Sequence, residues 1–110
     1  MPISLSPRYV YLRGPAGQKF TRTIKVRAEE SRPLKLEESN FDLDNKITYT
    51  IEEVEPGRLF RIHFATIPGP PENYKGVLTL KTNYPERPQI TIPITARFEG
   101  AGTVKKRGKN

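Results

Sequence analysis

Eleven prolines are spread along the 110-residue chain, and their spacing limits the secondary structure that the chain can form. An internal proline removes a helical hydrogen bond and clashes with the preceding turn. Only the stretches 16–32, 34–55 and 94–110 are long enough without proline to hold a helix of ordinary length. Within these stretches apolar residues recur at every second position, which is the period of a strand and not of a helix. The sequence therefore predicts an all-β chain.

Residues 89–98 show the alternation most clearly, because apolar side chains occupy every even position from Ile90 to Phe98. Successive side chains of a strand point to opposite faces, so these residues are predicted to face a core. Pro93 falls on the outward face and cannot donate to a ladder, which predicts a sheet edge or a bulge there. The same alternation elsewhere predicts a core led by Ile24, Val26, Ile51, Phe60, Ile62, Phe64, Leu78, Leu80, Ile90, Ile92 and Ile94.

Turn signals rich in Gly, Pro, Asp and Asn separate the predicted strands. Seven or eight short strands with such turns predict an immunoglobulin-like β-sandwich in which all strand pairs are antiparallel. Within it, Gly76 is expected to mark a bulge or a close approach of the backbone, and Tyr74 to tie a loop to the backbone. The sandwich is predicted to span residues 1–99. Residues 100–110 are predicted to form a disordered basic tail or linker.

The second half of the chain carries an ordered series of features, namely Val54-Glu55-Pro56-Gly57, the strand Leu59–Phe64, the segment Gly76–Asn83, Pro85, Pro88 and the strand Ile90–Ile94. This series resembles an uncharacterised bacterial immunoglobulin-like domain family, often found in envelope or lipoprotein contexts. That family is similar to the wider ASH and major-sperm-protein sandwiches. The resemblance is best over residues 50–98. It implies a role in scaffolding or protein interaction and no enzymatic activity.

Residues capable of catalysis or metal binding are sparse. The chain has no Cys and a single His, His63, which is predicted to lie on the outward face of a strand. A calcium-loop count that starts at Asp42 fails, because Ile47 stands where the sharp turn needs glycine. The sequence therefore predicts a protein that is not an enzyme, with no catalytic residue, no metal-binding residue and no cofactor.

Positive charge is the one compositional feature that points to a particular partner, because the chain carries a formal net charge of +7. Residues 1–27 contribute +6 with no acidic residue, residues 28–56 contribute −6, and the last ten residues contribute +4. This favours, as an alternative function, weak binding of nucleic acid or another anionic surface. The residues predicted for that role are Arg22, Lys25, Arg27, Lys105, Lys106, Arg107 and Lys109. Nucleic acid is not the favoured partner, because the Phe side chains fall in core phase and leave no stacking platform.

The favoured function is a non-enzymatic structural or protein-interaction module of a larger bacterial envelope protein. Its unidentified protein partner is expected to bind a sheet face or an exposed edge strand. The module is expected to be monomeric in isolation. A sugar-binding sandwich is a third alternative, and it would use Tyr9, Tyr11, Tyr74 and Tyr84.

The chain lacks an apolar run long enough for a membrane span or for the core of a signal peptide. A location in the periplasm or cell envelope is therefore expected only if a signal segment precedes this chain. Otherwise the location stays open.

Overall fold

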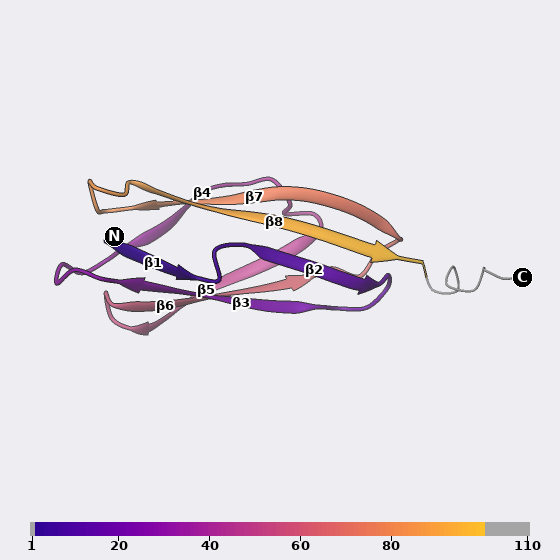
Figure 1. The fold of residues 1–110 in the computed structure, drawn as a ribbon, viewed down its shortest axis with the longest axis horizontal. Helices are drawn as coiled ribbons and strands as arrows, with labels where there is room; N and C mark the ends of the chain where they lie inside the picture. The colour runs from indigo at the N-terminus through magenta and orange to yellow at the C-terminus, as the bar shows by residue number, and fades with distance from the viewer. Residues whose placement is uncertain (1, 101–110) are drawn as a thin grey trace, which may run out of the picture.

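The computed structural model describes residues 2–100, in which the regular secondary structure consists of eight β-strands (Figure 1). The strands are β1 Ile3–Ser6, β2 Val10–Pro15, β3 Thr21–Ala28, β4 Leu36–Phe41, β5 Ile47–Glu55, β6 Leu59–Thr66, β7 Glu72–Thr82 and β8 Gln89–Glu99. The prediction of an all-β chain with seven or eight strands is confirmed. The predicted tail lies outside the described residues from position 101 onward.

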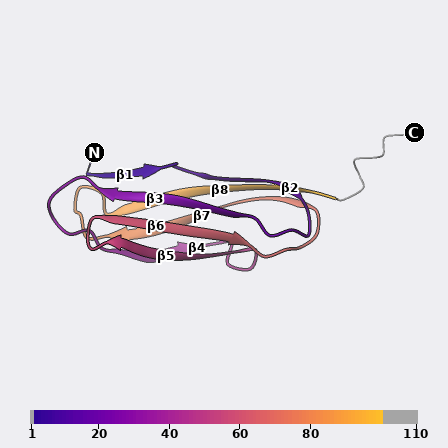
Figure 2. The same cartoon turned by 90° about the horizontal axis from the view of Figure 1, so that it is seen from below.

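The strands form two four-stranded sheets that pack face to face. The first sheet has the order β1-β3-β6-β5, which Figure 2 shows from below, and the second has the order β2-β8-β7-β4. No helix long and apolar enough to cross a membrane occurs within residues 2–100.

The core lies between the sheets and is formed by the inward-facing residues of the alternating strands. Ten of the eleven predicted core residues are buried. The exception is Ile51, which is half-buried and packs against the core from the margin. Its strand, β5, is the last strand of its sheet, so only one neighbouring strand covers it.

One strand pairing differs from the sequence prediction. Five pairings are antiparallel among residues 2–100, but β2 and β8 are parallel over Val10–Pro15 and Ile94–Glu99. The reason lies in the chain between β1 and β2, which crosses from one sheet to the other without a hairpin reversal. The Ser6–Pro7 peptide at this crossing is cis. Because the chain keeps its direction at this crossing, β2 continues the direction of β1 and pairs with β8 in parallel.

The position of Pro93 agrees with the sequence prediction. It is opposite Val77 of β7, while the pairing of β8 with β2 begins only at Ile94. Pro93 therefore lies in the half of β8 that has a strand on one side only. The missing N–H of a proline costs no ladder hydrogen bond on such an edge.

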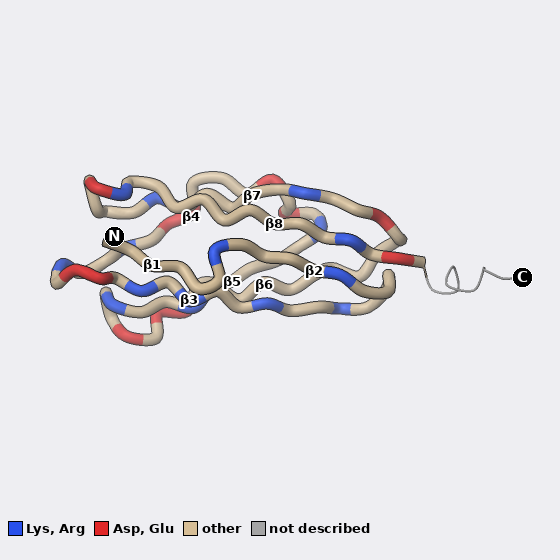
Figure 3. Tube along the Cα trace, viewed as in Figure 1, with Lys and Arg blue, Asp and Glu red and all other residues tan. Residues whose placement is uncertain are grey.

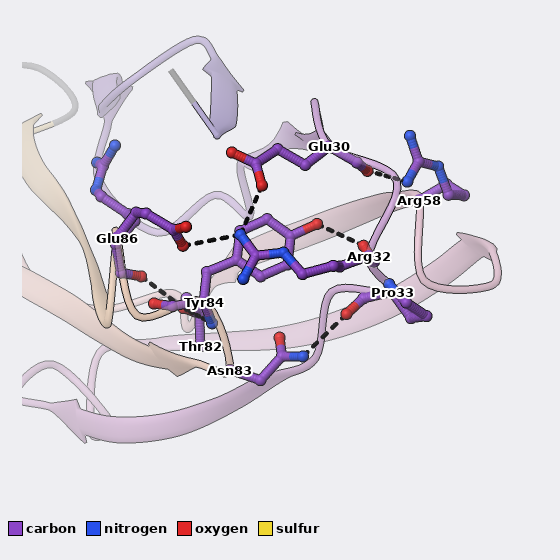
Figure 4. Close-up of polar contacts among 9 residues, drawn as sticks. Glu30, Arg32, Pro33, Arg58, Thr82, Asn83, Tyr84 and Glu86 are labelled. Atoms are coloured by element: carbon purple, nitrogen blue, oxygen red, sulfur yellow. Dashed lines mark hydrogen bonds and ion pairs between the residues drawn. The ribbon is translucent and has the colours of Figure 1, made fainter.

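A polar cluster around Tyr84 joins two loops at one end of the sandwich (Figure 4). The Tyr84 hydroxyl donates to the carbonyl of Arg32 at 2.5 Å, and the Arg32 guanidinium lies 4.5 Å from the Tyr84 ring centroid. That guanidinium also bonds Glu86 at 2.8 Å and Glu30 at 2.6 Å. The hydrogen bond from Arg32 lowers the pKa of Glu86. The loop after β3 and the loop after β7 are thus fixed to each other.

The tyrosine that ties a loop to the backbone is Tyr84, whereas the sequence pointed to Tyr74. Tyr74 packs its ring against Phe98, with a centroid distance of 5.9 Å, and lies 5.2 Å from Lys46 Nζ. Tyr84 is only 1% exposed, so it also cannot serve as one of the surface aromatics of a sugar-binding site.

Candidate interaction surface

The crossing of the chain between β1 and β2 leaves part of β3 without a strand on one side. The pairing of β1 with β3 ends at Ser6 and Lys25. Over Thr21–Ile24, β3 keeps β6 as its neighbour, and no other strand of the described chain pairs with it. We call Thr21–Ile24 the open edge. Backbone groups on such an edge are free to pair with another strand.

The backbone of Thr23 points toward this free side. The carbonyl of Phe20 accepts from Thr66 N–H and the N–H of Ala28 donates to Arg58, so even-numbered residues of β3 bond toward β6. The N–H of Glu29 instead donates to Pro2, on the β1 side. Because hydrogen-bonding direction alternates along an antiparallel strand, the odd residues Thr21 and Thr23 turn their N–H and C=O groups away from β6.

A groove of about 190 Å³ runs beside the open edge. It is lined by Pro7, Tyr9, Val10, Tyr11, Arg22, Thr23 and Ile24. Its two tyrosines are 57% and 42% exposed, and they make up two of the three exposed large hydrophobic side chains of residues 2–100. Phe20 closes the gap between β2 and β3 farther along, where it packs on Gly14 and stacks on Phe98 at 5.6 Å. Exposed tyrosines beside an arginine are typical of protein-binding surfaces.

Positive charge gathers on the same side of the sandwich. The three strands β1, β2 and β3 carry four Arg or Lys residues and no acidic residue, and Arg8 lies at the crossing. The opposite side, formed by β4 and β5, carries Glu37, Glu38, Glu52, Glu53 and Glu55 and no basic residue. Figure 3 shows this separation as blue segments along β2 and β3 and red segments on β4 and β5. The surface that holds the open edge is therefore the basic side.

On the acidic side, formed by β4 and β5, side-chain contacts join the two sheets. The ring of Tyr49 on β5 meets Phe41 on β4 edge to face at 5.0 Å, and the Tyr49 hydroxyl donates to Glu38. Burial, with the hydrogen bond to Glu38, raises the pKa of Tyr49. Both strands also carry a register shift on this side. Bulges and charges of this kind hinder pairing with a further strand.

The structure divides the basic residues that the sequence singled out. Lys25 and Arg27 lie together on the outward face of the first sheet, where Lys25 is opposite Arg61 of β6. Arg22 has the opposite phase and lines the groove instead. Lys105, Lys106, Arg107 and Lys109 lie outside the described residues. Sequence reasoning missed Arg61, because its place beside Lys25 depends on the pairing of β3 with β6.

His63 lies on the outward face of the first sheet, as the alternation predicted. Its Nδ1 is 3.2 Å from Thr23 Oγ1 and its Nε2 is 2.8 Å from Glu52 Oε1, so one hydrogen-bonded chain spans three strands. Hydroxyl, imidazole and carboxylate stand in the order used by nucleophilic hydrolases. The side chains of His63 and Glu52 are about half exposed on a sheet face. The chain of hydrogen bonds links β3, β6 and β5 across this face.

Solved structures with the same fold include a protein of unknown function from Porphyromonas gingivalis W83, at 18% identity and a TM-score of 0.68. The match covers 87% of this chain and 46% of that chain, so this chain spans about half the length of the Porphyromonas protein. The ASH / PapD-like domain of human CEP192 (PapD-like domain 7) matches at 5% identity and a TM-score of 0.62, over 91% of this chain and 87% of that one.

A C. elegans MSP family member matches at 18% identity and a TM-score of 0.48, over 86% of this chain and 97% of that one. No family model and no curated protein matches the sequence. The likenesses show the fold, an immunoglobulin-like β-sandwich. The fold class and the structural resemblance predicted from the sequence are confirmed.

Proposed function

We propose that this chain is a non-enzymatic protein-interaction module, and that the open edge with its groove is the surface that binds the partner. The observation that carries the proposal is the exposure of Tyr9 and Tyr11 beside an unpaired stretch of β3. Tyrosine side chains supply large contact areas at interfaces, and a free strand edge supplies backbone hydrogen bonds. The two features lie together on the basic side of the sandwich.

We also propose that the module belongs to a larger protein of the bacterial cell envelope. Support comes from the sequence resemblance to a bacterial domain family found in such contexts. It comes also from the Porphyromonas protein, which has this fold in one part of a chain about twice as long. A sandwich of this size has the usual size of one domain in a larger protein, and binding through a strand edge fits such an arrangement.

The alternative function, binding to nucleic acid or another anionic surface, has less support. It needs Arg22, Lys25 and Arg27 to act on one surface, and the structure puts Arg22 in the groove and the other two on the outward sheet face. Loss of binding to heparin or duplex DNA as salt rises would be its signature.

The double substitution Tyr9→Ser/Tyr11→Ser is expected to weaken partner binding at least tenfold, since central interface tyrosines each contribute about 1–2 kcal/mol. The experiment selects binders to the wild-type chain from a random 12-residue peptide display library. Each selected peptide is then synthesised and titrated by fluorescence anisotropy.

Ile67→Ser is the matched control, because Ile67 is similarly exposed, at 47%, but lies outside the groove. We expect it to change affinity less than twofold. Selected peptides that bind the double variant as tightly as the wild type would overturn the proposed surface. Thermal unfolding of each variant shows whether the fold is kept.

A further inference from the structure

The open edge is a regular strand edge, whereas other edges of the sandwich carry features that hinder pairing. The pairing of β3 with β6 runs from Thr21 to Arg27 without a register shift. In contrast, β4 and β5 are shifted at Glu38/Asn40 and Glu53/Glu55, and the one-sided half of β8 contains Pro93. A strand added at Thr21–Ile24 would continue the place that β1 occupies farther along β3. The geometry at this edge therefore suits an extended chain.

Arg22 covers part of this edge. Its Nη1 donates to the carbonyl of Thr21 at 2.7 Å, which is one of the backbone groups that turn away from β6. No carboxylate within residues 2–100 forms an ion pair with Arg22. An incoming strand must take the place of the guanidinium at that carbonyl. A carboxylate on the strand would then receive the guanidinium in a charge-assisted hydrogen bond.

The groove beside the open edge is lined by Arg22, which can bind a carboxylate, and by the rings of Tyr9 and Tyr11, which can pack against an apolar side chain. Arg22 is in phase with Ile24 and Val26, at the margin of the inward face of β3, and it lines the same groove as Tyr9 and Tyr11. Side chains two residues apart on an added strand point to the same face. One of them can reach Arg22 while the other lies on the tyrosines.

We propose, on the basis of the proposed function, that the occupant of this edge is an extended segment of a partner protein that carries a carboxylate two residues from an aromatic or aliphatic residue. The segment adds to β3 as a strand at Thr21–Ile24. Its carboxylate pairs with Arg22, and its apolar side chain packs on Tyr9 and Tyr11. The basic side of the sandwich, with no acidic residue in positions 1–27, favours an acidic segment.

The test selects 12-residue peptides from a random display library, once on the wild type and once on Arg22→Glu. Peptides from the wild type are expected to be enriched in Asp or Glu two positions from an apolar residue. Arg22→Glu is expected to weaken a synthesised wild-type binder at least tenfold. Changing the acidic residue of that peptide to Lys should restore binding to the variant. The amide of Thr23 should exchange with solvent at least tenfold more slowly in the complex.

Arg27→Glu is the matched control, because it makes the same charge change on the outward face of the same strand, and we expect less than a twofold effect. Peptides that require Tyr9 and Tyr11 but show no acidic enrichment and no response to Arg22→Glu would overturn this inference and leave the proposed function standing. The absence of any peptide dependent on the two tyrosines would overturn both. Self-association in sedimentation that Arg22→Glu abolishes would make a second copy the occupant and overturn the assignment of a partner segment.

Discussion

Replacing Tyr84 by alanine is expected to lower the free energy of unfolding by about 3–5 kcal/mol, the range for removing a large buried aromatic side chain. Tyr84 is the largest of the fully buried side chains, and its hydroxyl holds the loop after β3 through the carbonyl of Arg32. A domain of this size has a total stability of about 5–15 kcal/mol, so the variant would keep little margin. Urea unfolding followed by circular dichroism measures the change.

The hydroxyl contribution is isolated by Tyr84→Phe, which keeps the ring and removes the donor. The carbonyl of Arg32 would lose its donor in a partly buried place, so we expect a loss of about 1–2 kcal/mol. Tyr74→Phe is the control, because the contacts of Tyr74 with Phe98 and Lys46 are made through the ring. It is expected to change stability by less than about 0.5 kcal/mol. Equal stability of the two Phe variants would contradict the tying role of the Tyr84 hydroxyl.

Tyr84 ties a loop to the backbone, although the sequence pattern pointed to Tyr74 for that role. This difference shows where a sequence pattern stops being informative. Tyr84 stands in a Tyr-Pro-Glu turn signal, and turns are usually exposed. Its burial depends on a loop that lies 52 residues earlier in the chain and folds over it. No period or local composition reports such a contact. The alternation of apolar residues, in contrast, depends only on neighbours within one strand, and it correctly predicted the inward faces of β3, β6, β7 and β8.

The distinction between patterns within one strand and contacts between distant segments applies also to the sheet pairing and to the candidate surface. The two-residue period of a strand is enough to put Lys25 and Arg27 on one face of β3 and Arg22 on the other, as the structure shows. It could not show that β1 leaves β3 at Lys25, which is what opens the edge beside Arg22. The parallel pairing of β2 with β8 was missed for the same reason, because the crossing between the sheets is a property of the tertiary structure.

Gly76→Ala is expected to destabilise the sandwich by about 2–4 kcal/mol, through overpacking and through loss of one hydrogen bond. A Cβ at this position would lie 2.6 Å from Leu43 Cδ1, and still closer to Leu43 Cγ and Asp42 Oδ1. Leu43 is buried, and Asp42 Oδ1 accepts from the N–H of Val77 at 2.9 Å, so neither can move away without cost. Of the two sequence expectations for Gly76, the close approach is the correct one, since β7 pairs with β8 there without a bulge.

Gly69→Ala is the control for the general effect of adding a methyl group. A Cβ added at Gly69 would lie 3.9 Å from the carbonyl oxygen of Ile67, which is an ordinary contact. Its stability is expected to stay within about 0.5 kcal/mol of the wild type. A double-mutant cycle with Leu43→Ala then tests the contact itself. Truncating Leu43 makes room for the new methyl group, so the double variant should lose less stability than the two single losses added together. Strict additivity in urea unfolding would mean that Gly76 is required for a reason other than its contact with Leu43.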